Sequence, residues 1–466
     1  MESVHRTSLR HNRQTLKGDI EFPMPRWLCH IAYLSLFVAA GAFASSIDSR
    51  RDVERSVNLI EQGYHALART YLAPALIDYR LSDRERSRAY YLRGYSFYAE
   101  DLFVSASKDY HRALEFNPDN PRAIAALAGL HFYGQGVTQD RALAYQLFLK
   151  AAHLGNVLAQ FQVGYALLGG YGTEVNVEEA RSWLTRASES GHTPAMTHLA
   201  KSYREGVAAT PEPAIARDWY EKAYAAGAVD ALVALAYMYQ NGEFGEQDLT
   251  ESIRLFTQAA EAESGAGEVS LGHSYLTGTG VEQSYERALE LFEQAAARDT
   301  LASFMSLGHM FETGLGVPKN LKDAKQWYRR GAEAGLAAAQ LRLAYLLLAD
   351  GKLESRGRAL DWFSKAVAQD HPQAHNDYAW LLATSRSEEL RNGSLAVEHA
   401  ERAVEKKRTA AYLDTLAAAH AELGQFAEAI QFQQQALSLV GEQQIALSVE
   451  LQKHLSTYQE AKPWRE

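Results

Sequence analysis

The chain has 466 residues, of which 47% are hydrophobic, and its 47 basic and 57 acidic residues give a net charge of −10. This acidic balance, with no long basic block, argues against a nucleic-acid partner. The sole cysteine, Cys29, excludes a disulfide framework. If the N-terminal segment that holds it is removed, a cysteine nucleophile and a thiolate metal site are excluded as well.

Residues 1–44 are typical of an export signal. Five basic and three acidic residues precede an apolar run from Trp27 to Ala40, and the sequence Ala42-Phe43-Ala44 follows. A basic region, an apolar region and an A-x-A site predict cleavage after Ala44 and a periplasmic protein. The alternative is an uncleaved anchor in the inner membrane with the rest of the chain in the periplasm, since about 18 apolar residues suffice to span a bilayer. Membrane contact is expected only through this segment, and Met24 is an alternative start to Met1.

Residues 52–120 are predicted to form helical hairpins. Apolar residues recur with helical period over 52–83 and indicate one hairpin. In 86–120, Gly94 and Ala106 are small where two helices would cross, Ala113 is small where the next pair would dock, and Pro118 would end the second helix. This second stretch resembles a tetratricopeptide repeat.

From Pro121 onward, small residues recur at a fixed spacing of 36 residues. Two such series in lockstep predict one structural unit copied in tandem. We call the first series the turn glycines, because glycine supplies the positive φ that ends one helix and directs the chain into the next. The turn glycines are Gly134, Gly170, Gly206, Gly242, Gly278 and Gly314. The second series is Ala151, Ala187, Ala223, Ala259, Ala295 and Gly331.

The first helix of each copy carries an apolar residue followed by a small one, as in Leu127-Ala128 and Leu307-Gly308, and the second helix carries an aromatic pair such as Trp327-Tyr328. With the turn glycines, these features resemble the Sel-1-like repeat, a relative of the tetratricopeptide repeat. The resemblance covers 121–371 and implies an all-α, right-handed superhelical solenoid of antiparallel helix hairpins. The third and fourth copies lack the second glycine of the turn, so we expect reshaped loops and unchanged helices there.

The remaining chain is expected to close the array. Residues 372–445 resemble tetratricopeptide hairpins, with a stretched loop from Thr384 to Gly393. Residues 446–466 are predicted to form a capping helix and a polar tail, because a solenoid must cover its apolar end.

No pattern in the chain predicts catalysis, a cofactor or a metal. Glycine pairs such as Gly134-x-Gly136 can hold phosphates, but here they follow a helix instead of a strand and lack a third glycine, so a structural turn is favoured. His273 and His309 occupy equivalent positions in consecutive repeats. Because packed helices lie ~8–10 Å apart, a surface role is favoured over shared metal ligation.

The candidate binding residues lie on the first helix of each repeat, just after its small residue. In tetratricopeptide-type repeats this position points into the concave groove. We call these positions the groove column, and five of its six members carry rings with polar atoms, which suit recognition of peptides or glycans. The alternative is that they only tile an exposed helix face. The column is Tyr165, Lys201, Tyr237, His273, His309 and Tyr345, and one turn further lie Arg204, Gln240 and Glu312.

The sequence therefore predicts a non-catalytic scaffold that binds a protein or peptide partner in the groove. The family resemblance implies adaptor roles in envelope, polysaccharide-export or secretion complexes. The alternatives are a glycan or cell-wall-binding module and, third, a cryptic envelope enzyme. An enzyme would need clustered acids in a closed pocket, which the sequence does not offer.

Overall fold

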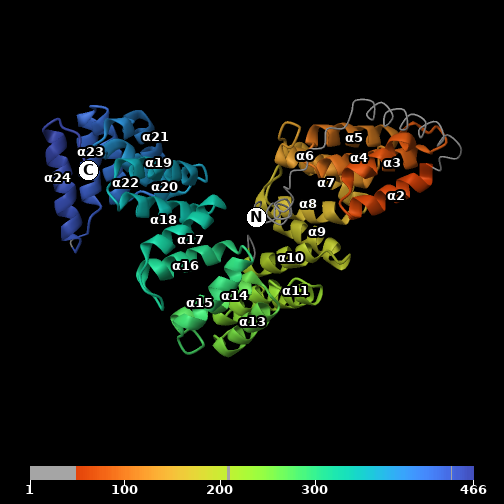
Figure 1. Ribbon diagram of the computed structural model, residues 1–466, viewed down its shortest axis with the longest axis horizontal. Helices are drawn as coiled ribbons and strands as arrows, with labels where there is room; N and C mark the ends of the chain where they lie inside the picture. Colours follow the sequence, from red (N-terminus) through yellow and green to blue (C-terminus); the bar gives the residue numbers. More distant parts are fainter. Residues whose placement is uncertain (1–48, 207–209, 442) are drawn as a thin grey trace, which may run out of the picture. The chain divides into compact units, whose positions relative to one another are not determined.

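The computed structural model describes residues 49–206, 210–441 and 443–466, and all the regular elements in these ranges are helices (Figure 1). The predicted export signal, residues 1–44, falls before the first of these ranges. Within the described ranges, none of the helices has the length and apolar character needed to cross a membrane. The described chain divides into two compact units, one ending at Leu255 and one beginning at Phe256.

The unit that ends at Leu255 consists of consecutive helix hairpins, and each second helix also packs on the next first helix. Its helices are α2 (Ser49–Glu61), α3 (His65–Ile77), α4 (Asp83–Tyr98), α5 (Phe103–Phe116), α6 (Pro121–Tyr133), α7 (Arg141–His153), α8 (Val157–Gly169), α9 (Val177–Glu189), α10 (Thr193–Glu205), α11 (Pro213–Ala225) and α12 (Ala231–Gln240). The unit boundary itself falls within α13 (Leu249–Glu261).

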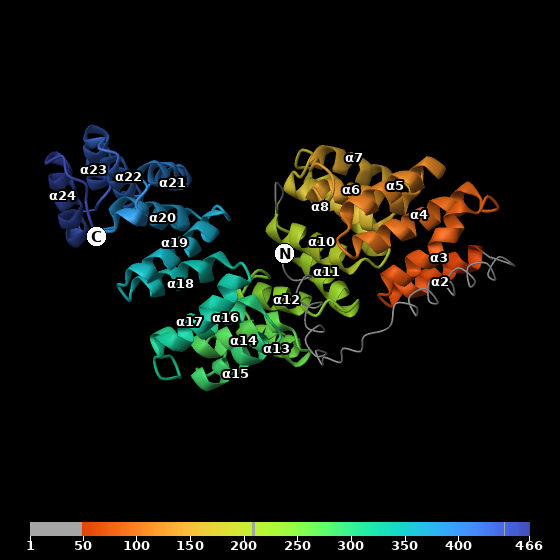
Figure 2. The ribbon, with the colours of Figure 1, turned by 45° about the horizontal axis from the view of Figure 1, so that its top comes forward.

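The unit that begins at Phe256 repeats the same arrangement (Figure 2). It contains α14 (Gly265–Thr277), α15 (Tyr285–Ala297), α16 (Leu301–Thr313), α17 (Leu321–Glu333), α18 (Ala337–Leu348), α19 (Leu353–Val367), α20 (Pro372–Thr384), the 3-10 helix η1 (Glu388–Leu390), α21 (Gly393–Lys406), α22 (Ala410–Glu422), α23 (Phe426–Ser438) and α24 (Ile445–Gln459). The all-α prediction and the pairing of adjacent helices are confirmed.

Five of the six turn glycines are the C-cap residues of first helices, as predicted, whereas Gly242 lies one residue beyond Asn241, the C-cap of α12. All six have positive φ, between 59° for Gly206 and 85° for Gly314. After the turn, a backbone hydrogen bond ties the start of the second helix to the carbonyl three residues before the glycine. In the copy with Gly314, the N–H of Asn320 donates to Phe311 O at 2.8 Å. The side chain of Asn320 then caps α17 by accepting from Asp323 N. The repeat thus encodes both ends of the hairpin turn.

Small residues allow the helices to approach closely. Each alanine of the second series is fully buried. A Cβ on Gly308 would lie 2.4 Å from Cε1 of Tyr328, and one on Gly94 would lie 2.7 Å from Cε1 of Tyr110. Both rings are buried in the core. The predicted role of the small residues at helix crossings is therefore confirmed.

The expectation of unchanged helices is wrong for α12, which has 10 residues where α10 and α14 have 13. At its start, Ala231 N bonds to Ala228 O, and at its end, Gly242 N bonds to Tyr239 O. These bonds span three residues instead of four, so tighter turns replace the outer α-helical turns. The loop of this copy is reshaped as expected, and the ring of Phe244 packs on Tyr239 with 4.8 Å between centroids.

Candidate functional site

The groove column is largely exposed, as predicted. Lys201, Tyr237, His273, His309 and Tyr345 are exposed, and Tyr165 is half-buried. The residues on either side along each helix are buried, for example Ala236 and Met238 beside Tyr237, which is 37% exposed. Three column residues, Tyr165, Lys201 and Tyr237, belong to the unit ending at Leu255, and the other three to the unit beginning at Phe256.

Tyr165 lies in an aromatic cluster of its unit. Its ring centroid is 5.2 Å from that of Tyr171, 5.5 Å from His198 and 6.2 Å from Phe161. Burial lowers the pKa of the His198 imidazole, and the nearby Lys201 ammonium and His192 lower it further. This end of the column is an aromatic surface with a neutral imidazole beside an exposed lysine.

His273 on α14 contacts the next repeat. Its Nε2 lies 3.1 Å from Oγ of Ser306 on α16, and its ring lies edge-on to Phe292. Although His273 is exposed on the column face, packing of its ring against the neighbouring side chains partly removes it from water and lowers its pKa, and His309 on α16 adds to the effect. In the described part of the chain, no three His, Cys, Asp or Glu side chains are grouped in a way that could hold a metal ion. The two histidines therefore present hydrogen-bonding rings on adjacent helices.

Tyr345 on α18 donates its hydroxyl hydrogen to Oδ2 of Asp377 on α20. Asp377 also accepts from Gln373 Nε2 at 2.8 Å and from Asn376 Nδ2 at 3.0 Å. Burial raises the pKa of Asp377 even though these donors oppose the shift. The column residue is thus held in place by a polar network on the following first helix.

The second row of candidate residues is engaged within the chain. Arg204 forms an ion pair with Glu243, and Glu312 accepts from the hydroxyl of Tyr328 at 2.7 Å. The carbonyl of Gln240 accepts from Gln247 Nε2 at 2.6 Å. These contacts show that Arg204 and Glu312 hold neighbouring segments together, whatever else they bind.

Two column residues were missed from the sequence. Tyr95 follows Gly94 on α4 and is 41% exposed, and Trp380 follows Ala379 on α20 and is half-buried. Both follow the small residue of a first helix, so continuing the register into the two flanking regions would have identified them. Sequence reasoning stopped at the ends of the 36-residue spacing.

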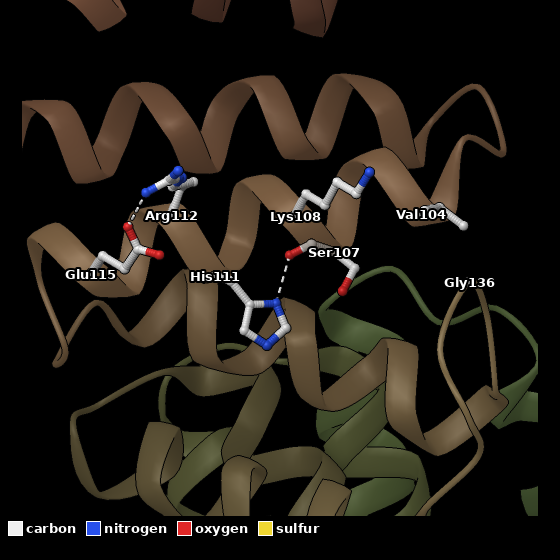
Figure 3. Close-up of a pocket in the computed structure, with 7 residues that line it drawn as sticks. All are labelled: Val104, Ser107, Lys108, His111, Arg112, Glu115 and Gly136. Carbon is white, nitrogen blue, oxygen red and sulfur yellow. Dashed lines mark hydrogen bonds and ion pairs between the residues drawn. The ribbon is translucent and has the colours of Figure 1, made fainter.

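The structure also has an open hollow of about 550 Å³ along α5 (Figure 3). Lys108, His111 and Arg112 give it a basic lining. Nδ1 of His111 lies 2.8 Å from the carbonyl of Ser107, and Arg112 pairs with Glu115 at 2.5 Å. Both of these contacts lie within α5.

The fold and the exposed column define a class of protein: a helix-hairpin repeat protein that presents one face of its first helices. The model of the Sel1 repeat matches eight segments: 121–156, 157–192, 193–227, 229–264, 266–299, 305–336, 337–371 and 372–407. The chain belongs to the Sel1 repeat family, whose members are generally non-catalytic scaffolds that bind protein partners. The last segment falls in the region expected to form tetratricopeptide-like hairpins.

The chain is also similar to a curated protein and to two solved structures. The chain is 42% identical over 80 residues, 16% of its length, to an exopolysaccharide production negative regulator of Rhizobium meliloti (strain 1021), and the match spans only 29% of that relative. It is similar to the crystal structure of a protective antigen of uropathogenic Escherichia coli strains with an SLR fold (27% identity, 81% of each chain, TM-score 0.44). It is also similar to a Sel1 repeat protein from Oxalobacter formigenes (26% identity, 52% of this chain and 96% of that one, TM-score 0.44).

Proposed function

We propose that this Sel1 repeat protein is a scaffold for an envelope-associated protein complex and binds its partner through the groove column. The observation that carries this proposal is the exposure of five column residues between buried neighbours. The tyrosine ring combines a large apolar surface with a polar hydroxyl, and tyrosine is enriched among the residues that dominate binding energy at interfaces.

The envelope assignment is part of the same proposal. It is supported by the basic and apolar pattern of residues 1–44 and by the relative named as an exopolysaccharide production regulator. We place the repeats in the periplasm after cleavage behind Ala44, with an inner-membrane anchor as the alternative. Mass spectrometry of the purified protein tests this: a first residue of Ser45 supports cleavage, and an intact N-terminal segment supports the anchor.

Site-specific photo-crosslinking tests the column. A photoreactive residue at Tyr237 is expected to capture a partner protein in cells. The same residue at Glu221, which is exposed on the second helix α11, is expected to capture none. Equal capture at both positions would remove the basis for assigning the partner to the column.

A glycan-binding module is the second candidate, because exposed Tyr237 and Tyr345 can also stack on sugar rings. Calorimetric titration of the purified chain with envelope polysaccharide distinguishes the glycan-binding module from the protein scaffold. Saturable binding that Tyr237→Ala weakens would favour the glycan module, and no heat of binding would favour the protein scaffold.

A further inference from the structure

Residues 463–466 fold back onto the end of α20. The backbone N–H of Glu466 donates to Thr384 O at 2.8 Å, and Arg465 Nη1 donates to Ala383 O at 3.0 Å. The last carbonyls of a helix have no partner within the helix. Because α20 ends at Thr384 and its C-cap is Ser385 instead of a turn glycine, this segment supplies donors in a repeat that has lost its usual turn.

Each side chain of the segment occupies a separate place. The ring of Trp464 packs on His454 of α24 with 4.4 Å between centroids. Arg465 pairs with Glu422 at the end of α22 at 2.5 Å. The carboxylate of Glu466 accepts from Trp380 Nε1 at 2.6 Å. The indole, the guanidinium and the carboxylate are thus each bound at a different place. Extended peptides are recognised in the same way, by separate pockets for their side chains.

The face that receives the segment continues the groove column. Trp380 follows the small residue Ala379, as Tyr345 follows Ala344 one repeat earlier. On α22 the corresponding residue, Ala418, is buried in the cluster that Trp464 packs against. The first helices α20 and α22 therefore have this face covered by the chain itself, whereas α14, α16 and α18 leave it exposed.

We propose that α20, α22 and α24 form a binding site for an extended partner peptide that carries an aromatic residue, an arginine and a carboxylate in this order, and that residues 463–466 occupy this site in the free chain. The inference rests on the proposed function in holding that first-helix faces bind protein segments. It adds the chemistry of one partner and a device that regulates access to it.

The segment is held in a way that permits displacement. Ala461, which reverses the chain after α24, has a φ of 55°, a conformation that alanine adopts at a cost. The indole Nε1–H of Trp464 is buried and donates to no acceptor. The short connection from Gln459 compensates by keeping the local concentration of the segment in the millimolar range.

A fluorescent peptide with the sequence of residues 460–466 (Glu-Ala-Lys-Pro-Trp-Arg-Glu) tests the proposal. It is titrated against the full chain and against a chain that lacks 463–466. We expect saturable binding to the shortened chain and at least tenfold weaker binding to the full chain. Glu422→Gln in the shortened chain, or a peptide with both Trp464→Ala and Arg465→Ala, is expected to abolish binding.

Circular dichroism shows whether the shortened chain keeps its helicity. If it does not, the full-length Trp464→Ala/Arg465→Ala variant replaces it, with the same expected binding. No binding to a folded variant up to about 1 mM peptide, the upper end of such local concentrations, would overturn the proposal. Equal binding to the full and shortened chains would also overturn it. Alanine substitutions at Tyr237, His273 and His309 leave this site intact, so the two proposals can fail separately.

Discussion

Arg204 on α10 holds Glu243, in the loop after α12, through a two-pronged ion pair. Arg204 Nη2 lies 2.6 Å from Oε1, and Nε lies 2.9 Å from Oε2. This loop lacks the second turn glycine, and the ion pair ties it to the preceding repeat. Burial raises the pKa of Glu243, but hydrogen bonds from Arg204 and Asn241 outweigh this, so the pKa lies below its ordinary value.

Removing this charge is expected to loosen the loop. Because each side chain is about a quarter exposed, solvent weakens the pair, and Glu243→Gln should cost about 1 kcal/mol. A carboxylate with a lowered pKa stabilises the fold above its ordinary pKa, and this contribution is lost as the pH falls through the lowered value. The melting temperature at pH 7 should therefore fall for Glu243→Gln and stay unchanged for the exposed control Glu246→Gln. Equal values for both variants would show that the pair does not hold the loop.

The second glycine of the turn is required because the backbone of the preceding repeat approaches it closely, in addition to its positive φ. A Cβ on Gly172 would lie 2.0 Å from the carbonyl oxygen of Arg141, at the start of α7. Gly191 also has positive φ, but its Cβ would meet no atom within 4 Å. Gly191→Ala should cost about 1 kcal/mol through its backbone conformation, and Gly172→Ala about 3 kcal/mol or more through the added clash. Thermal melts compare the two, and matched losses would show that the loop does not depend on this close approach.

Gly308 should tolerate no side chain, because it packs on the buried ring of Tyr328. Gly308→Ala is expected to destabilise its unit by about 1–3 kcal/mol. The matched control is Gly357 inside α19, whose Cβ would have open space. Gly357→Ala should stabilise by about 0.5–1 kcal/mol, since alanine loses less entropy in a helix. If both changes stabilise, the crossing at Gly308 is looser than the structure shows.

A buried histidine pair should make the stability of the unit that begins at Phe256 sensitive to acid. Nδ1 of His375 on α20 lies 3.0 Å from Nδ1 of His399 on α21. Burial lowers the pKa of both imidazoles. Asp370 opposes the shift at His375, and His375 adds to the shift at His399. Arg402 and Lys406 further disfavour a proton on His375, whereas Glu398 favours one on His399.

Since the folded chain holds these imidazoles neutral, the unfolded chain binds more protons below about pH 6.5. Stability is therefore full above that pH and declines as the pH falls toward the lowered values. The melting temperature should drop between pH 7 and pH 5, and the His375→Gln/His399→Gln variant should drop less. Parallel curves for the two proteins would contradict this account.

The periodic part of the fold could be predicted from the sequence because its causes are local. The φ of each turn glycine and the closeness of Gly308 to Tyr328 follow from residue type and spacing. The same register placed the groove column on an exposed face. The contacts that the candidate residues make within the chain could not be predicted, because those of Arg204 with Glu243 and of Tyr345 with Asp377 depend on how one repeat packs on the next.

The least predictable feature was the end of the described chain. The sequence predicted a polar tail after a capping helix, and the structure has α24 in this stretch. The tail instead packs Trp464, Arg465 and Glu466 against helices up to 110 residues earlier in the chain. No periodic pattern connects such distant segments, so only the folded structure brings them together.

The central claim is that the groove column binds the partner. The direct measurement is co-purification from envelope extract with the tagged chain, its Tyr237→Ala/His273→Ala/His309→Ala variant, and a control with Glu221→Ala, Glu293→Ala and Arg329→Ala, three exposed second-helix positions. We expect the column variant to lose the partner while it keeps its helicity and stays folded at the temperature of the assay, and the control to keep the partner. Full retention of the partner by the column variant would contradict the account.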